Sequence, residues 1–253
     1  MRTLAAALAL VTALPAAGDD AVIYKLRPAV DIPVIVGGFA VAGVPYLLGD
    51  HVLPHRCPCD PAEVNRFDRF AIDHASGGAA TLSDVTVGVA VAAPPLVDAL
   101  RLGFGEAFTA DAVVYAQTLA VNSALVVVAK YAFQRPRPRT YAGDPAFLTT
   151  DDGYQSFYSG HTSTVVAALT AAAWTARWRH GEQVWPWVVV GLGGASVGAE
   201  RVLAGRHFPT DVIAGAVMGF AVGTVVPWLH RKHDDPAVAV SPLPYGISLS
   251  GRF

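Results

Sequence analysis

The sequence predicts an all-α fold, a polytopic bundle of about five to six membrane-spanning helices. Of its 253 residues, 53% are apolar and only 15% are charged, and the mean hydropathy is +0.42. This composition is more apolar than that of an average soluble domain and favours a membrane protein. A chain of this length forms one domain with a sizeable core. The net charge of −2 gives no reason to expect a nucleic acid as partner.

Four apolar runs in the C-terminal half have the composition of membrane helices. The two longest hold 18 residues without a charge. Such a run reaches about 27 Å as a helix, close to the hydrocarbon core of a bilayer. No run alternates polar and apolar residues, so helices are expected rather than strands. The four runs are 112–129, 162–176, 183–199 and 212–229.

Two weaker apolar runs precede these four. Residues 32–49 contain two adjacent glycines and Pro45, and residues 85–97 contain Pro94 and Pro95. The sequence leaves open whether 32–49 crosses the membrane. Residues 50–84 form the one long polar segment, and a short, flexible, loop-like tail is expected from Asp234.

The N-terminus has the pattern of an export signal. Arg2 precedes an apolar stretch, and small residues at 16–18 suit cleavage before Asp19. We therefore predict a signal peptide over residues 1–18 and a single domain over 19–253, with an uncleaved first anchor as the alternative.

Basic residues predict the orientation of the helices. Arg177 and Arg179 follow one apolar run, and Arg231 and Lys232 follow the last. Under the positive-inside rule these ends are cytoplasmic. The loops near 130–161 and 200–211 then lie together on the extracytoplasmic face of the cell membrane.

Cys57 and Cys59 are the two cysteines of the chain. Two ligands cannot complete a zinc site, and a second cysteine pair is absent from the sequence. We interpret them as loop thiols or a local redox clip.

Three short motifs, in order, carry the polar chemistry. The first supplies two cations that can converge on one anion. The second supplies a hydroxyl and the free amides of a helix N-terminus, which bind anions, followed by a histidine. The third supplies a cation, a histidine and a carboxylate one helical turn later, close enough to hydrogen-bond the imidazole. The motifs are Lys130 with Arg137; Ser159, Gly160 and His161; and Arg201, His207 and Asp211.

The order and spacing of these motifs, over residues 130–211, resemble the type 2 phosphatidic acid phosphatase family. That family shares its fold and site with bacterial class A acid phosphatases and vanadium haloperoxidases. The resemblance implies that His207 is the nucleophile, that His161 protonates the leaving group and that Asp211 orients His207. It implies that phosphate is bound by Lys130, Arg137, Ser159, Gly160 and Arg201.

The resemblance also implies metal-independent hydrolysis of a phosphomonoester or diphosphate through a phosphohistidine. No cofactor is expected, and vanadate is expected to inhibit. The membrane location suggests a lipid phosphate as substrate, such as phosphatidic acid, phosphatidylglycerol phosphate, an isoprenyl diphosphate or a lipid A phosphate. Membrane lipid is the expected surrounding, and the sequence indicates no obligatory protein partner.

Four neighbours of the motifs differ from the family pattern or lie outside it. Tyr158 stands where the family usually has proline. Glu200 stands where it usually has serine, and beside a phosphate site this acid must point away or pair with a cation. Arg135 and Arg139 match no motif position and are expected to face lipid headgroups.

Three alternatives stay open. A soluble secreted acid phosphatase would use the same chemistry without the membrane, and a haloperoxidase would bind vanadate with the same residues. The third alternative is a lipid-binding or transport protein without enzymatic activity.

Overall fold

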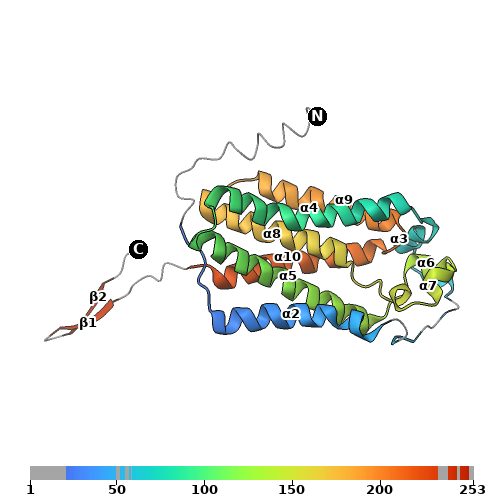
Figure 1. Ribbon diagram of the computed structural model, residues 1–253, viewed down its shortest axis with the longest axis horizontal. Helices are drawn as coiled ribbons and strands as arrows, with labels where there is room; N and C mark the ends of the chain where they lie inside the picture. Colours follow the sequence, from blue (N-terminus) through green and yellow to red (C-terminus); the bar gives the residue numbers. More distant parts are fainter. Residues whose placement is uncertain are drawn as a thin grey trace, which may run out of the picture.

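The computed structural model describes residues 21–49, 52–54, 57, 59–232, 239–243 and 246–250. Within this part of the chain, six long helices run along one axis of the molecule (Figure 1). This arrangement confirms the predicted all-α membrane bundle. The six are α2 (Pro28–Leu48), α4 (Gly77–Leu102), α5 (Glu106–Phe133), α8 (Gly160–His180), α9 (Trp185–Leu203) and α10 (Pro209–His230).

Helix α8 lies at the centre of the bundle, where it packs against α4, α5, α9 and α10. Four of the surrounding helices, α2, α4, α5 and α10, are long and apolar enough to cross a membrane. Val165, Ala167 and Ala168 of α8 are completely buried, whereas Val89 of α4 and Val217 of α10 are exposed. A central helix meets other helices instead of lipid, so it does not need an apolar surface all round.

Helix α4 extends well beyond the predicted run 85–97, even though Pro94 and Pro95 lie inside it. A proline has no N–H, so these two leave the carbonyls of Ala90 and Val91 without their helical donors. The hydroxyl of Tyr115, on α5, lies 3.0 Å from the Val91 oxygen and 3.3 Å from the Ala90 oxygen. A neighbouring helix thus satisfies the freed carbonyls, and the helix continues.

The bundle has two different ends. The basal end holds short connections: residues 21–27, 103–105, 181–184 and 231–232. The opposite end, here called the loop end, holds the longer ones. Its short helices are η1 (Pro61–Glu63), α3 (Arg66–Arg69), η2 (Phe70–Asp73), α6 (Pro138–Tyr141), α7 (Pro145–Leu148) and η3 (Asp151–Tyr154).

Helix α2 covers the run that the sequence left open and lies along α5. The segment before it is held at the basal end, because Lys25 N donates to the His230 carbonyl at 2.7 Å and Lys232 N to the Ile23 carbonyl at 2.9 Å. Residues 21–27 and the loop end therefore lie at opposite ends of the bundle. The predicted signal peptide, 1–18, lies outside the described residues.

Two smaller features complete the fold. Cys57 and Cys59 are joined by a disulfide, so the cysteine pair is a local clip and not a pair of free thiols. In the tail, β1 (Ala239–Leu243) pairs antiparallel with β2 (Gly246–Ser250), where the sequence predicted only a loop.

Candidate active site

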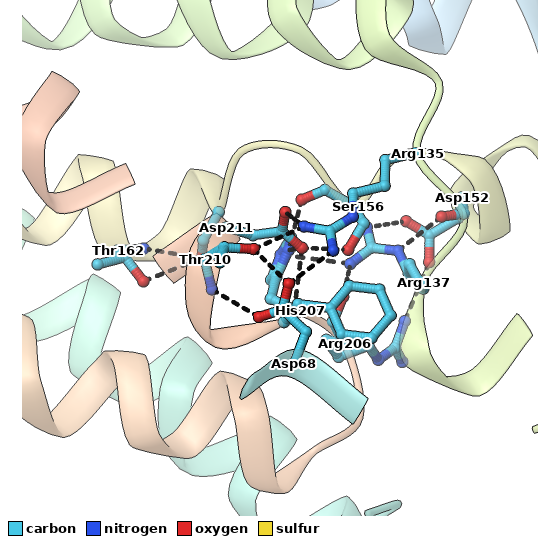
Figure 2. Close-up of polar contacts among 12 residues, drawn as sticks. Asp68, Arg135, Arg137, Asp152, Ser156, Thr162, Arg206, His207, Thr210 and Asp211 are labelled. Atoms are coloured by element: carbon cyan, nitrogen blue, oxygen red, sulfur yellow. Dashed lines mark hydrogen bonds and ion pairs between the residues drawn. The ribbon is translucent and has the colours of Figure 1, made fainter. Parts of the chain in front are cut away.

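His207 lies at the loop end, in the turn between α9 and α10, and its side chain is 1% exposed. Its Nδ1 is 2.7 Å from the carbonyl oxygen of Ser156. A carbonyl only accepts, so Nδ1 carries the proton and the lone pair is on Nε2. That nitrogen is 3.3 Å from Nη1 of Arg137. The predicted nucleophile is therefore fixed with its nucleophilic nitrogen facing a guanidinium (Figure 2).

Asp211 lies beside His207 but does not hydrogen-bond it. Its Oδ2 is 4.0 Å from Nδ1 of His207, beyond hydrogen-bond range, so the predicted direct bond between carboxylate and imidazole is wrong. The carboxylate instead accepts from the Ser156 hydroxyl at 2.6 Å and from Phe208 N at 3.0 Å. Asp211 thus holds the residue whose carbonyl orients the imidazole. The prediction failed because Ser156 is distant in sequence.

Arg135 joins two carboxylates behind His207. Its Nη1 is 2.5 Å from Asp211 Oδ1 and its Nη2 is 2.8 Å from Asp68 Oδ2. Both carboxylates are 0% exposed, and the guanidinium lies over the ring of Phe208. The sequence did not predict that Arg135 pairs with two buried acids, and about a quarter of its side chain stays exposed. Arg139 likewise pairs with Asp144 and lies over Phe147.

Arg137 is held rigidly by Asp152, a residue of η3. Nε of Arg137 donates to the Asp152 carbonyl and Nη2 to its carboxylate, both at 2.6 Å. Nη1 also donates to the carbonyl of Arg206 at 2.7 Å. The other carboxylate oxygen of Asp152 accepts from Arg206 at 3.0 Å. The structure therefore adds a further cation, Arg206, and an acid, Asp152, to the site.

Arg201 is a buried cation on the last turn of α9, only 6% exposed. Its Nη1 donates to the hydroxyl of Ser83 on α4 at 3.0 Å, while its Nε has no partner among the described residues. A buried N–H without an acceptor is suited to an anionic ligand. Glu200 points away from this site and accepts from Thr86 and Ser196, which is one of the two arrangements expected for an acid at this position.

The N-terminus of α8 carries the second motif. The Ser159 hydroxyl caps the helix: it lies 3.4 Å from Thr162 N and 2.9 Å from the Thr162 hydroxyl. Gly160 is its first helical residue, and an added Cβ there would press on Val126. Nε2 of His161 is 2.7 Å from Oδ1 of Asp84, on α4. In the structure the hydroxyl of Ser159 acts mainly as the N-cap of α8, and His161 has a carboxylate partner.

Positive charge dominates the surroundings of His207. Burial, together with the charges of Arg137, Arg201 and Lys130, holds the pKa of His207 well below its usual range. Burial by itself raises the pKa of Asp152, but Arg137, Lys130 and Arg206 outweigh it and lower that pKa. His207 is therefore neutral near pH 7, with its Nε2 lone pair unprotonated. Arg137, Arg201, Arg206 and Lys130 thus gather around His207 and Asp152, and this concentration of basic side chains favours an anionic ligand.

The structure brings together the residues of all three motifs at the loop end. Sequence reasoning missed the polar neighbours that orient them, because these come from other segments or lack a motif. A signal existed for two of them, since Ser83 and Asp84 are polar residues directly before the apolar run 85–97. The missed residues are Asp68, Ser83, Asp84, Asp152, Ser156 and Arg206.

Comparisons with known proteins point to one superfamily. The family model of the PAP2 superfamily matches residues 111–235. A lipid A 1-phosphatase of Porphyromonas gingivalis is 32% identical over 113 residues, which are 44% of this chain and 22% of that protein. The chain thus spans about a fifth of the length of this curated relative. No solved structure matches the chain.

Proposed function

Residues 111–235 belong to the PAP2 superfamily, and on that premise we propose that this protein is a metal-independent phosphatase of a membrane lipid phosphate. One observation carries the proposal: His207 is buried, neutral and directs its Nε2 lone pair at a cluster of cations. A neutral imidazole is a nucleophile, and cations that offset phosphate charge make phosphorus open to attack. In the described part of the chain, acids, histidines and cysteines form no cluster of three or more that suits a metal.

The positions of the side chains support the following reaction. Phosphate binds among Arg137, Arg201 and Lys130, with the helix amides near Gly160 as further donors. The Nε2 lone pair of His207 forms a bond to phosphorus, and the bond to the leaving oxygen breaks. His161 gives that oxygen a proton, so an alcohol departs and phosphohistidine remains. Water then attacks phosphorus and gives a proton to His161, the bond between Nε2 of His207 and phosphorus breaks with its electron pair returning to Nε2, and inorganic phosphate leaves.

A lipid substrate is supported by the fold and by the relative. The site lies at one end of a bundle whose outer helices are apolar enough for a membrane, and the similar protein is named a lipid A 1-phosphatase. A phosphate ester of a membrane lipid reaches such a site without leaving the bilayer. The soluble secreted phosphatase is therefore the weaker alternative.

We place the loop end outside the cytoplasm. Basic residues at the basal end, Lys25, Arg27, Arg177, Arg231 and Lys232, support this orientation under the positive-inside rule. Six long helices lie between residues 21–27 and residues 231–232, so both segments are at the basal end. This orientation therefore puts residues 21–27 in the cytoplasm. If the chain were cleaved before Asp19 and the new N-terminus lay outside the cytoplasm, the loop end would instead lie in the cytoplasm.

The test is a screen of the purified protein in detergent against phosphatidic acid, phosphatidylglycerol phosphate, an isoprenyl diphosphate and a lipid A phosphate. We expect phosphate release from at least one, unchanged by EDTA and blocked by vanadate. Turnover that EDTA abolishes and a divalent metal restores would overturn the metal-independent mechanism. Bromide oxidation by the vanadate-loaded protein, without phosphatase activity, would identify a haloperoxidase.

A further inference from the structure

Helix α4 lies outside the matched residues 111–235, yet two of its adjacent side chains contact two motif residues. The Ser83 hydroxyl accepts from Nη1 of Arg201 at 3.0 Å and lies 2.6 Å from the Ala80 carbonyl. The next residue, Asp84, accepts from Nε2 of His161 at 2.7 Å. One turn of α4 therefore touches both the third and the second motif.

Ser83 and Asp84 differ in burial, and this difference suggests different roles. Ser83 is completely buried, so its hydroxyl is fixed between Arg201 and the helix backbone. The Asp84 side chain is 67% exposed and that of His161 31% exposed, so this pair borders the open side of the site. An exposed ion pair adds little to stability, which makes a purely structural role for Asp84 a weak explanation.

The charges around His161 suggest a chemical role for its contact with Asp84. Burial, together with the charges of Arg201 and Lys130, lowers the pKa of His161, and the contact with Asp84 raises it without outweighing them. Cations disfavour the protonated form of an imidazole, and a carboxylate in contact with it favours that form. A general acid needs its proton, so His161 needs a nearby acid at this position.

We propose that Asp84 is a positioning residue for leaving-group protonation, an inference that rests on the proposed phosphatase function. Asp84 accepts Nε2–H of His161 throughout the reaction and thereby leaves Nδ1–H as the proton to be transferred. As the phosphorus–oxygen bond breaks, its electron pair goes to the leaving oxygen, which receives the Nδ1 proton. In the second step Nδ1 takes a proton from the attacking water. Ser83 is the parallel positioning residue for Arg201 and so for phosphate binding.

Two substrates with different leaving groups test the inference. An alkyl leaving oxygen, as in dioctanoyl phosphatidic acid, must be protonated as it departs, whereas the nitrophenolate of p-nitrophenyl phosphate leaves as an anion. Asp84→Asn should lower kcat/KM for the phosphatidic acid by about 10- to 100-fold, which is part of the roughly 10²- to 10⁴-fold that a general acid contributes, because His161 itself is retained. It should change kcat/KM for p-nitrophenyl phosphate, which covers the steps up to departure of the leaving group, by less than about threefold, because nitrophenolate leaves without a proton.

Three variants serve as references. Asp84→Glu restores the carboxylate and should recover most of the lost phosphatidic acid turnover. Asp73→Asn removes an exposed charge at the loop end and should leave both substrates unaffected. Ser83→Ala should raise KM for both substrates together, because Arg201 binds phosphate whatever the leaving group. Thermal melting in detergent checks that each variant is folded.

The outcomes separate this inference from the proposed function. If the wild type releases phosphate from neither substrate nor from the lipids of the screen, the phosphatase function is wrong. If the wild type hydrolyses both and Asp84→Asn lowers both equally, or neither, Asp84 does not act through leaving-group protonation. Selective loss of phosphatidic acid turnover, with recovery in Asp84→Glu, supports the inference.

Discussion

At the scale of single residues, His207 depends on contacts that no short motif contains. The Ser156 carbonyl fixes its tautomer, and three cations and burial keep it neutral. The sequence correctly predicted that Asp211 lies close, because the two residues are one helical turn apart. It could not predict that Ser156, 51 residues away, comes between them. Side-chain partners from distant segments follow from tertiary packing and not from local spacing.

The lowered pKa of His207 predicts the pH dependence of activity. A histidine titrating near its usual pKa of about 6.5 would give kcat/KM an acid limb there. Since the His207 pKa lies well below that value, the nucleophile stays neutral as the pH falls through 6.5. The acid limb should then follow the substrate, whose phosphate dianion takes up a proton near pH 6 to become a monoanion. We expect the limb to lie at lower pH for an aryl phosphate than for an alkyl phosphate. The same limb near 6.5 for both substrates would show that His207 titrates normally.

Arg135 shows how one side chain can tie three segments together. It connects α3 and the start of α10 to the segment after α5, through two fully buried carboxylates. Removal of the shared cation leaves both acids without their main partner, and breaking a buried pair typically costs about 3–5 kcal/mol. Arg135→Met should therefore lower the thermal unfolding midpoint in detergent clearly, by several degrees.

The matched control for this prediction is Arg66→Met. Arg66 is an exposed arginine of α3, and its replacement should leave the unfolding midpoint nearly unchanged. Equal midpoints for the two variants would mean that the Arg135 clamp contributes nothing to stability.

At the scale of helices, glycines bring α10 against α8. An added Cβ at Gly215 or Gly223 would lie 2.6 Å from the backbone oxygen of Ser159 or Ala167, and one at Gly219 would collide with Ser163. Small residues at every fourth position allow membrane helices to approach closely. This contact positions the α8 N-terminus beside His207. The sequence shows the glycines, but which helix they face depends on the tertiary arrangement.

Gly219→Ala tests this contact. The added methyl group must push α8 and α10 apart, because it meets backbone and not a flexible side chain. We expect a loss of thermal stability, at least as large as the typical overpacking cost of about 1–3 kcal/mol, and lower phosphatase activity. Gly191→Ala on α9 is the control, since a Cβ there meets nothing within 4 Å. A Gly219→Ala protein as stable and active as the control would contradict close packing at this position.

At the scale of the whole molecule, hydropathy predicted the bundle better than it predicted the individual helices. The four C-terminal runs correspond to α5, α8, α9 and α10. Helices α2 and α4 contain prolines that look like breaks in sequence, yet in α4 a hydroxyl of α5 satisfies the freed carbonyls. The even number of long helices between residues 21 and 232 also places both ends of this segment at the basal end.

Cysteine labelling in intact cells tests the orientation. In a background with Cys57 and Cys59 replaced by serine, Glu63→Cys marks the loop end and Lys25→Cys the basal end; both positions are exposed. An impermeant thiol reagent should label position 63 in intact cells and position 25 only after the membrane is broken. The opposite pattern would place the active site in the cytoplasm and favour cleavage before Asp19.

The most direct test of the central claim is to trap the phosphoenzyme. The purified protein is mixed with a radiolabelled substrate from the screen, denatured rapidly under conditions that keep phosphohistidine, and digested for peptide mapping. We expect an acid-labile label on the peptide that contains His207, present in His74→Ala and absent in His207→Ala, with phosphate release by His207→Ala at background. Undiminished turnover by His207→Ala, or a label on another residue, would contradict the account.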